Sequence, residues 1–282
     1  MNKTWEAATL RILFIGDVYG RPGREIVARR MGPLVKETGA DLVILNGENA
    51  ANGAGITAQI CRELFALGVD VITLGNHAWD KREIATYIDE EARLIRPINF
   101  PPGTPGAGSC LVKRGGRPVM AVIQAHGRVF ASHLLEDPFR AVAEEVERLR
   151  QSTPVIVVDF HAEATSEKQA MGWYLDGMAS AVIGTHTHVQ TADELILPGG
   201  TAYISDVGMC GPWISVIGAD RALAVERFLT QMPVRLEAAQ GPAILSAVLL
   251  EVEEATGRVT AVQRIFEREV VTEPLDSLFG RW

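Results

Sequence analysis

Three short apolar runs near the start of the chain are each followed by a polar turn and then by a segment with helical character. The apolar runs cover residues 11–15, 41–45 and 69–74. The helical segments are expected at residues 22–36, from Thr57 to a stop at Gly68, and at 81–88. Successive strand-loop-helix units pair their strands in parallel and cover the sheet with helices. The pattern therefore predicts a layered α/β fold.

The rest of the chain continues in strands and helices after a long loop at residues 97–108. No Gly-Lys-Ser/Thr follows the glycines of that loop, which excludes a phosphate-binding loop of this type. Asp137 is placed to cap a helix that begins at Pro138. Further strands are expected at residues 110–112, 119–124, 155–160, 181–188, 194–197, 202–204, 244–252 and 259–266, and further helices at 165–175 and 220–229. No linker or repeat interrupts the chain, so we expect a single domain over residues 1–282.

Charge and composition narrow the possible functions. The net charge of −8 argues against a stable nucleic-acid partner, because such proteins usually present a basic face to the phosphates. A small anionic substrate remains possible, since bound cations would reverse the local sign of charge. We expect a cytoplasmic protein with no membrane partner, because neither a signal peptide nor a long apolar span is present. Three scattered cysteines suggest neither disulfides nor a structural zinc site.

Polar residues of metal-binding type follow five of the expected strands. They are Asp17, Glu48 with Asn49, Asn76 with His77, His161, and His186 with His188. Each has an ordinary explanation when taken alone: a turn-stabilising side chain, a solvated loop acid or a core histidine. In open α/β sheets, however, ligands bind outside the carboxyl ends of the strands, where all these side chains would gather. The set as a whole predicts a metal centre.

The His-x-His pair ends the strand that starts at Ala181. Alternate residues of an extended segment point to the same side, so His186 and His188 are expected to face one point. Carboxylate, amide and imidazole donors without a thiolate suit manganese, iron or zinc. Seven candidate ligands are too many for one tetrahedral ion, so we expect two ions that share Glu48.

His77 is the candidate general acid. It follows the candidate ligand Asn76 directly, so its side chain should come close to the metals without necessarily binding them. A positioned imidazole of this kind can protonate a leaving oxygen. His77 could instead be a further ligand or an ordinary loop residue.

Taken in order, these motifs resemble those of the calcineurin-like metallophosphoesterases. The resemblance lies in Gly16-Asp17, an acid with Asn after a second strand, Gly75-Asn76-His77, a lone His161, and Gly184-Thr185-His186-Thr187-His188. Two departures stand out: Tyr19 replaces a usual histidine, and Glu48 follows Gly47 where an aspartate is usual. The departures resemble the YmdB-type branch of bacterial 2′,3′-cyclic nucleotide phosphodiesterases. Segments 14–18, 46–50, 159–168, 184–190 and 206–209 are similar to it.

The resemblance implies a four-layer sandwich of two mixed β-sheets flanked by α-helices. It also implies two metal ions, usually iron. One would be held by Asp17, Glu48, Asn49 and His188, and the other by Glu48, Asn76, His161 and His186. His77 would be the proton donor, and Asn49 would partly replace the histidine missing at Tyr19. The family often orients that proton donor with an acid directly after it, where this chain has Ala78 and then Asp80 two residues later.

The resulting hypothesis is that the protein hydrolyses a small phosphodiester to a nucleoside monophosphate. The preferred substrate in this hypothesis is a 2′,3′-cyclic nucleotide such as 2′,3′-cAMP. A metal-bridging hydroxide would attack phosphorus while His77 protonates the leaving ribose oxygen. The alternatives are a phosphomonoesterase, an RNA nuclease with the same site chemistry, or a metal-containing regulatory protein whose turnover is incidental. Association into a homo-oligomer is left open.

Overall fold

The computed structural model describes residues 8–271. The strands of this part of the chain form two sheets. The eight-stranded sheet contains β1 (Thr9–Ile15), β2 (Asp17–Val18), β3 (Leu42–Asn46), β4 (Val71–Thr73), β5 (Leu94–Ile95), β12 (Met209–Pro212), β13 (Ala243–Glu253) and β14 (Val259–Arg268). The six-stranded sheet contains β6 (Ser109–Arg114), β7 (Arg117–His126), β8 (Ile156–His161), β9 (Ala181–Thr185), β10 (Leu195–Ile196) and β11 (Ala202–Ile204).

Both sheets are mixed. In the first, β1, β3, β4 and β5 pair in parallel in that order, while β13 pairs antiparallel with β1 on its other side. In the second, β7, β8, β9 and β11 are parallel, and β6 and β10 close the two edges antiparallel. The C-terminal strand pair therefore completes the sheet that the first ninety-five residues begin.

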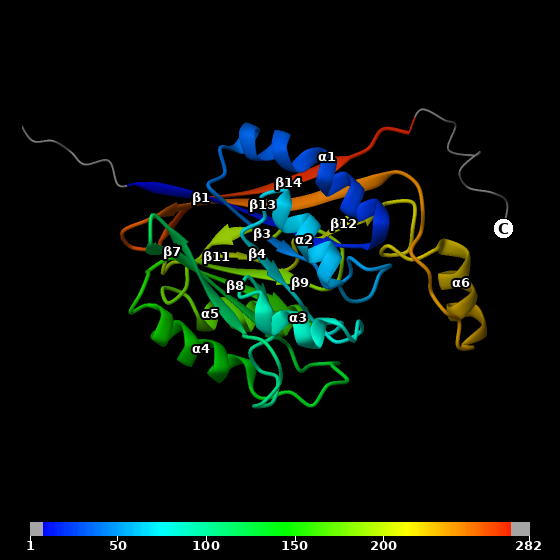
Figure 1. The fold of residues 1–282 in the computed structure, drawn as a ribbon, viewed down its shortest axis with the longest axis horizontal. Coiled ribbons are helices and arrows are strands. Elements are labelled where there is room, and N and C mark those ends of the chain that lie inside the picture. Colours follow the sequence, from blue (N-terminus) through cyan, green and yellow to red (C-terminus); the bar gives the residue numbers. More distant parts are fainter. Residues whose placement is uncertain (1–7, 272–282) are drawn as a thin grey trace, which may run out of the picture.

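Within residues 8–271, five helices cover the outer faces of the two sheets: α1 (Gly20–Thr38), α2 (Ala58–Ala66), α3 (Ile84–Glu90), α4 (Pro138–Leu149) and α5 (Thr165–Tyr174). A further helix, α6 (Arg221–Thr230), lies away from these faces. One buried cluster joins α1, α2 and α3 to the first sheet, and another joins α4 and α5 to the second. A third lies between the sheets and includes Phe14, Ile44, Val157 and Ile183. The layers run helix, sheet, sheet, helix, with α1 and α4 on opposite sides of Figure 1, which confirms the predicted four-layer α/β fold.

Most expected elements are present, with shifted ends. The Asp137 side chain caps α4 by accepting hydrogen bonds from the N–H groups of Phe139 and Arg140, with Pro138 in the first turn as predicted. The third helix begins at Ile84 instead of residue 81. Strands β2, β5 and β12 were not predicted, because runs of two to four residues carry no periodicity. They form through pairing with distant strands.

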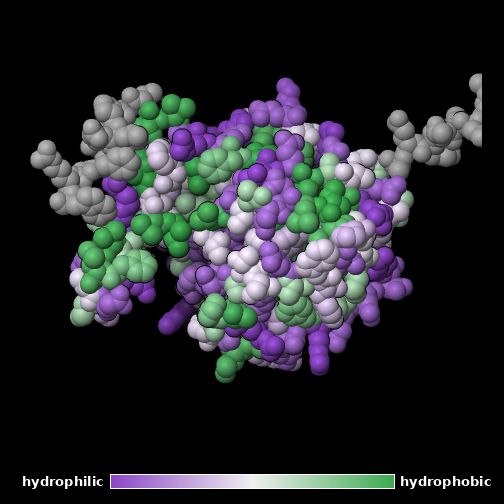
Figure 2. All heavy atoms as spheres, turned by 180° about the vertical axis from the view of Figure 1, so that it is seen from behind, coloured by the Kyte–Doolittle hydropathy of each residue, from purple (hydrophilic) through white to green (hydrophobic). Residues whose placement is uncertain are grey.

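Helix α6 projects from the edge of the molecule in Figure 1. Phe228, Leu229 and Met232 on and after this helix are well exposed, and Figure 2 shows apolar side chains on the same projection from behind. Among residues 8–271, every helix is too short or too polar to cross a lipid bilayer.

Candidate metal centre

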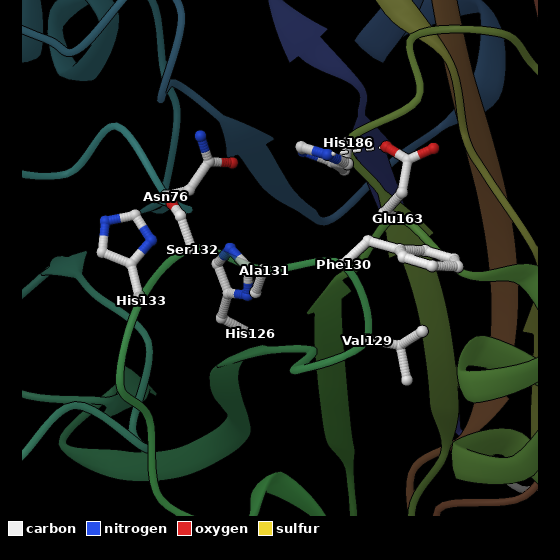
Figure 3. A pocket seen from close by; sticks show the side chains of 9 residues that line it. All are labelled: Asn76, His126, Val129, Phe130, Ala131, Ser132, His133, Glu163 and His186. Carbon is white, nitrogen blue, oxygen red and sulfur yellow. Dashed lines mark ion pairs between the residues drawn. The ribbon is translucent and has the colours of Figure 1, made fainter.

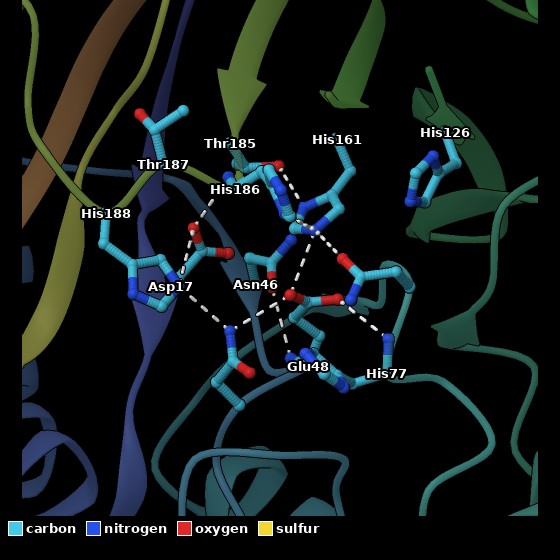
Figure 4. A network of polar contacts seen from close by, with 12 residues as sticks. Asp17, Asn46, Glu48, His77, His126, His161, Thr185, His186, Thr187 and His188 are labelled. Atoms are coloured by element: carbon cyan, nitrogen blue, oxygen red, sulfur yellow. Dashed lines mark hydrogen bonds and ion pairs between the residues drawn. The ribbon is translucent and has the colours of Figure 1, made fainter. Parts of the chain in front are cut away.

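The expected ligands meet at one edge of the sandwich, where the parallel strands of both sheets end. Asp17 follows β1, the pair Glu48 and Asn49 follows β3, and Asn76 follows β4. From the second sheet, His161 ends β8, and His186 and His188 follow β9. Figure 4 shows the side chains of Asp17 and Glu48 from the first sheet and those of His161, His186 and His188 from the second pointing toward one another. The fold therefore brings these distant loops together.

His161 lies at the middle of the first group of donors. Its Nε2 atom is 3.0 Å from Glu48 Oε1, 3.0 Å from Asn76 Oδ1 and 3.0 Å from His186 Nδ1. Glu48, His161 and His186 also form a cluster whose ligand atoms lie within 4.8 Å of one another.

The outer nitrogens of these two histidines have hydrogen-bond acceptors of their own. His161 Nδ1 lies 2.8 Å from the hydroxyl oxygen of Thr185, which itself donates to Asp159 at 2.7 Å. His186 Nε2 lies 3.0 Å from a carboxylate oxygen of Glu163. In the neutral rings the hydrogens therefore sit on the outer nitrogens, and the inner nitrogens carry lone pairs. Two lone-pair nitrogens, a carboxylate oxygen and an amide oxygen thus face one point, which suits a cation.

A second group of donors adjoins the first through Glu48. The Asn49 amide nitrogen lies 3.0 Å from Glu48 Oε1 and 3.1 Å from His188 Nε2, and that ring nitrogen is 4.0 Å from Asp17 Oδ2. An amide nitrogen donates hydrogen bonds and does not bind a cation, so the Asn49 amide would have to turn over to present its oxygen. His188 Nδ1 donates to the carbonyl oxygen of Ile217 at 2.8 Å, so its Nε2 also carries a lone pair. Asp17 Oδ1 is buried without a hydrogen-bond partner among the described residues. A second cation would satisfy it.

The electrostatics of the centre also favour bound cations. Burial raises the pKa of Asp17 well above its ordinary value, and the nearby carboxylates of Glu48 and Asp206 raise it further. Burial also raises the pKa of Glu48, but His161 and the other histidines outweigh this and lower it overall. Burial and the neighbouring His161 lower the pKa of His186 to about 4, so its ring is neutral at pH 7. Clustered buried carboxylates and neutral imidazoles are the ligand set of a divalent or trivalent metal.

One geometric expectation is wrong. Strand β9 ends at Thr185, and His186 and His188 have positive φ angles of 104° and 68°, so the segment is not extended there. His186 faces His161, while His188 faces Asn49 and packs edge-on against the Tyr19 ring. The two imidazoles therefore reach the two donor groups separately, because the left-handed backbone turns each one its own way.

His77 lies beside the centre and is held by Asp80. Its ring Nδ1 is 2.9 Å from Asp80 Oδ2, and its backbone N–H donates to Glu48 Oε2 at 3.3 Å. Ala78 is completely buried. Asp80 thus supplies the carboxylate that the sequence lacks directly after His77, and it contacts the ring through Nδ1.

Sequence reasoning missed the residues that support the ligands. Asp159 is fully buried in β8 and accepts hydrogen bonds from Asn46 and Thr73 of the first sheet and from Thr185 of the second. Burial raises its pKa to about 7. The available signal was a single acid inside an otherwise apolar strand, since such an acid needs buried partners. Glu163, Thr185 and Asp206 lie in segments that are similar to the YmdB-type branch, but nothing in their residue type or position indicated that they contact the ligands.

Known proteins share both the sequence and the fold. The chain matches the family described as YmdB-like protein over residues 13–265. It is 50% identical over 256 residues to the 2′,3′-cyclic-nucleotide 2′-phosphodiesterase of Bacillus subtilis (strain 168), covering 91% of this chain and 96% of the relative. It is 35% identical over 261 residues to a putative phosphatase/phosphodiesterase of Mycoplasma genitalium, covering 91% and 92% of the two chains.

Two solved structures have the same fold. A hypothetical protein from Thermus thermophilus superposes with a TM-score of 0.85 at 44% identity, covering 93% of this chain and all of the other. A novel phosphatase from Mycoplasma pneumoniae superposes with a TM-score of 0.87 at 35% identity, covering 93% and 94%. With matches that extend over most of its length in both sequence and structure, the chain belongs to the YmdB-like family.

Proposed function

We propose that this protein is a binuclear-metal phosphodiesterase that hydrolyses 2′,3′-cyclic nucleotides to nucleoside monophosphates. Its homologues indicate a phosphoric ester hydrolase, and the relative with 50% identity is named for this substrate class. The observation that carries the proposal is the set of four proton-free donor atoms formed by His161 Nε2 and its three neighbours, Glu48 Oε1, Asn76 Oδ1 and His186 Nδ1. Metal-dependent hydrolysis explains why these groups are buried together.

Two ions would share Glu48 in this proposal. Glu48, Asn76, His161 and His186 would hold one ion, and Asp17, Glu48, Asn49 and His188 the other. Iron is our preferred metal, with manganese and zinc as alternatives suited to the same donors. When bound, such ions lower the pKa of a water molecule and offset the charge of a phosphoryl transition state.

His77 would donate the proton that the leaving ribose oxygen needs. Its Nδ1 hydrogen is directed to Asp80 at 2.9 Å, which fixes the ring, so His77 would act as the imidazolium and give up its second proton, on Nε2, to the leaving oxygen. The backbone bond from His77 to Glu48 ties the position of this acid to the shared ligand. Together, the contacts of His77 with Asp80 and Glu48 would hold the proton donor next to a phosphate bound at the metal centre.

Metal analysis combined with a rate panel tests the proposal. Iron content of the freshly purified protein would be measured beside initial rates on 2′,3′-cyclic, linear and terminal phosphates. We expect two ions per chain and the highest rate on the cyclic substrate. A preference for terminal phosphates would instead favour the phosphomonoesterase, and a preference for longer RNA the nuclease.

Two variants separate metal binding from acid catalysis. Glu48→Gln should lose metal and activity together, because it removes the shared carboxylate. His77→Ala should lose activity while the metal stays. Full turnover by His77→Ala on a substrate with a poor leaving group would contradict the acid assignment.

A further inference from the structure

A hollow adjoins the candidate metal centre and extends outward from it. Its volume is about 100 Å³, and Asn76 and His186 form the wall toward the metal centre. The other walls come mainly from the loop after β7, residues 127–133. Figure 3 shows Asn76 and His133 on one side, Glu163 and Phe130 on the other, and His126 between them. A phosphate at the metal centre would therefore have the rest of its molecule in this hollow.

His126 presents an unused hydrogen-bond acceptor to the hollow. The residue is only 5% exposed, and its Nδ1 donates to the carbonyl oxygen of Gly127. Its Nε2 therefore carries the lone pair of the neutral ring, and this buried atom has no partner among residues 8–271. The backbone of His126 is fixed by both polar atoms of the Asn99 side chain, at 2.8 and 3.0 Å. A buried, rigid and unsatisfied acceptor is unusual and needs an explanation.

Phe130 is held in an unfavourable conformation at the rim of the same hollow. It is the third residue of a turn closed by a hydrogen bond from Ala131 N–H to Arg128 O, and its φ is 63°. Glycine or asparagine is usual at such a position, and a bulky residue there is strained. The phenyl ring is nevertheless 85% exposed to water. Backbone strain that presents an apolar ring to solvent at a cavity points to a contact with a ligand.

The base of this loop is anchored. The Glu167 carboxylate on α5 accepts hydrogen bonds from the N–H groups of Arg128 and Val129, at 2.9 and 3.2 Å. Gly127 N–H donates to the carbonyl oxygen of His161 at 3.0 Å. The loop is thus tied to a candidate metal ligand, while its tip carries the exposed phenyl ring.

We propose that the loop of residues 127–133 is the nucleoside-binding subsite, in which Phe130 packs on the face of the base and His126 Nε2 accepts a hydrogen bond from a sugar hydroxyl. This inference rests on the proposed function, because it takes the phosphate to lie at the metal centre. A neutral acceptor selects a donor such as a hydroxyl, and a flat apolar ring accepts any base by stacking. The subsite would bind nucleotides with little preference between bases.

Binding measurements test the subsite without relying on turnover. The affinity of the metal-loaded protein for 3′-AMP and for ribose 3-phosphate, which lacks a base, would be measured by calorimetry. Phe130→Ala should lower the preference for 3′-AMP over ribose 3-phosphate by about tenfold, as expected for loss of one stacked base. Leu134→Ala is the matched control, because Leu134 directly follows this loop, is 93% exposed and does not line the hollow. It should leave the preference unchanged.

His126→Phe keeps an aromatic ring but removes the acceptor, together with the Nδ1 hydrogen bond to Gly127. His126→Phe should lower the affinity for 3′-AMP and for ribose 3-phosphate by a similar factor. His126→Gln, which restores an oxygen acceptor, should recover part of the affinity. Metal content and melting temperature would show that each variant keeps its metal centre and fold. Equal affinity losses for both ligands in Phe130→Ala, or wild-type affinity in His126→Phe, would overturn the proposal.

The proposed function and the proposed subsite can be tested independently. The proposed function is wrong if the wild-type protein does not hydrolyse 2′,3′-cAMP, even if Phe130→Ala still lowers the preference for 3′-AMP over ribose 3-phosphate. The subsite fails if turnover is normal and the discrimination is absent.

Discussion

Gly75 leaves the space in which Glu48 and His161 approach each other. A Cβ atom at this position would lie 2.1 Å from Glu48 Oε2 and 2.4 Å from His161 Cδ2, which is far inside van der Waals contact. Gly75→Ala should therefore displace the shared carboxylate and reduce both metal content and activity by more than tenfold. Metal analysis and initial rates on 2′,3′-cAMP would measure this.

Gly32 provides the control for that substitution. It lies in α1, and a Cβ added there meets nothing within 4 Å. Gly32→Ala should keep the metal and raise the free energy of unfolding by about 0.5–1 kcal/mol, because alanine favours a helix. Equal metal content in the two alanine variants would contradict the steric role of Gly75.

Asp80 should affect the rate without affecting metal binding. It contacts His77 Nδ1 and is itself half exposed, so Asp80→Asn should leave the fold intact but misplace the proposed proton donor. We expect kcat to fall by about tenfold, less than the roughly 10²–10⁴-fold contribution of a general acid, because His77 itself remains, with KM and metal content nearly unchanged. Asp80→Glu should restore part of the rate.

The leaving group provides a second measurement for Asp80. A p-nitrophenyl phosphodiester needs less protonation of its leaving oxygen than a ribose ester, so its hydrolysis should be less sensitive to Asp80→Asn. An equal loss of rate on both substrates would indicate a structural role for Asp80.

At the residue scale, the candidate ligands could be chosen from the sequence, but the nitrogen of each imidazole that carries the hydrogen could not. Asp17, Glu48 and His161 stood out because each follows a recognisable strand. Which imidazole nitrogen faces the centre depends on Thr185, Glu163 and the Ile217 carbonyl, and only the folded chain brings these acceptors into place.

Among the elements, α5 holds the loop that carries His186 and His188. Lys168 on α5 is only 2% exposed, and its Nζ lies 2.8 Å from Asp206 Oδ2. The same carboxylate accepts hydrogen bonds from the backbone and hydroxyl of Thr187, at 2.9 and 2.8 Å. This buried ion pair thus fixes the residue between the two histidines.

Lys168→Met should be strongly destabilising. It leaves the Asp206 carboxylate buried without its cation, and breaking a buried pair from one side costs about 3–5 kcal/mol. Denaturant unfolding of the variant would measure the loss. The double variant with Asp206→Asn should recover part of it, because no buried charge is then left alone. An unchanged unfolding midpoint in Lys168→Met would refute the role of the pair.

Element boundaries near the site could not be predicted because they depend on distant pairing. Strand β2 exists because Asp17 and Val18 pair in parallel with Met209 and Cys210, almost two hundred residues away. The left-handed turn at His186 and His188 is likewise imposed by contacts from Asp17, Asp206 and Ile217. Local sequence favours an extended strand there, and tertiary contacts override it.

For the whole molecule, the candidate ligands divide between the two sheets, so bound metal should stabilise the complete sandwich. A ligand that binds only the folded state raises its stability in proportion to the logarithm of its free concentration. We expect chelation to lower the melting temperature, because it leaves Asp17 and Glu48 buried close together without a counter-charge. Scanning calorimetry with and without a chelator would measure the shift.

Glu48→Gln is the control for this effect. Without the shared carboxylate, the melting temperature should depend much less on the chelator. A chelator-induced shift as large as that of the wild type would show that the stabilising metal binds elsewhere.

The division of the centre along the chain has a consequence for biosynthesis. Four of its seven expected ligands precede residue 77, while the remaining three come after residue 160, and β13 pairs with β1 only once residue 253 has been made. A nascent chain shorter than 161 residues would therefore contain none of the three expected imidazole ligands. If the chain binds the proposed ions, neither ion could find its full set of ligands until residue 188 has been made and the second sheet has begun to fold.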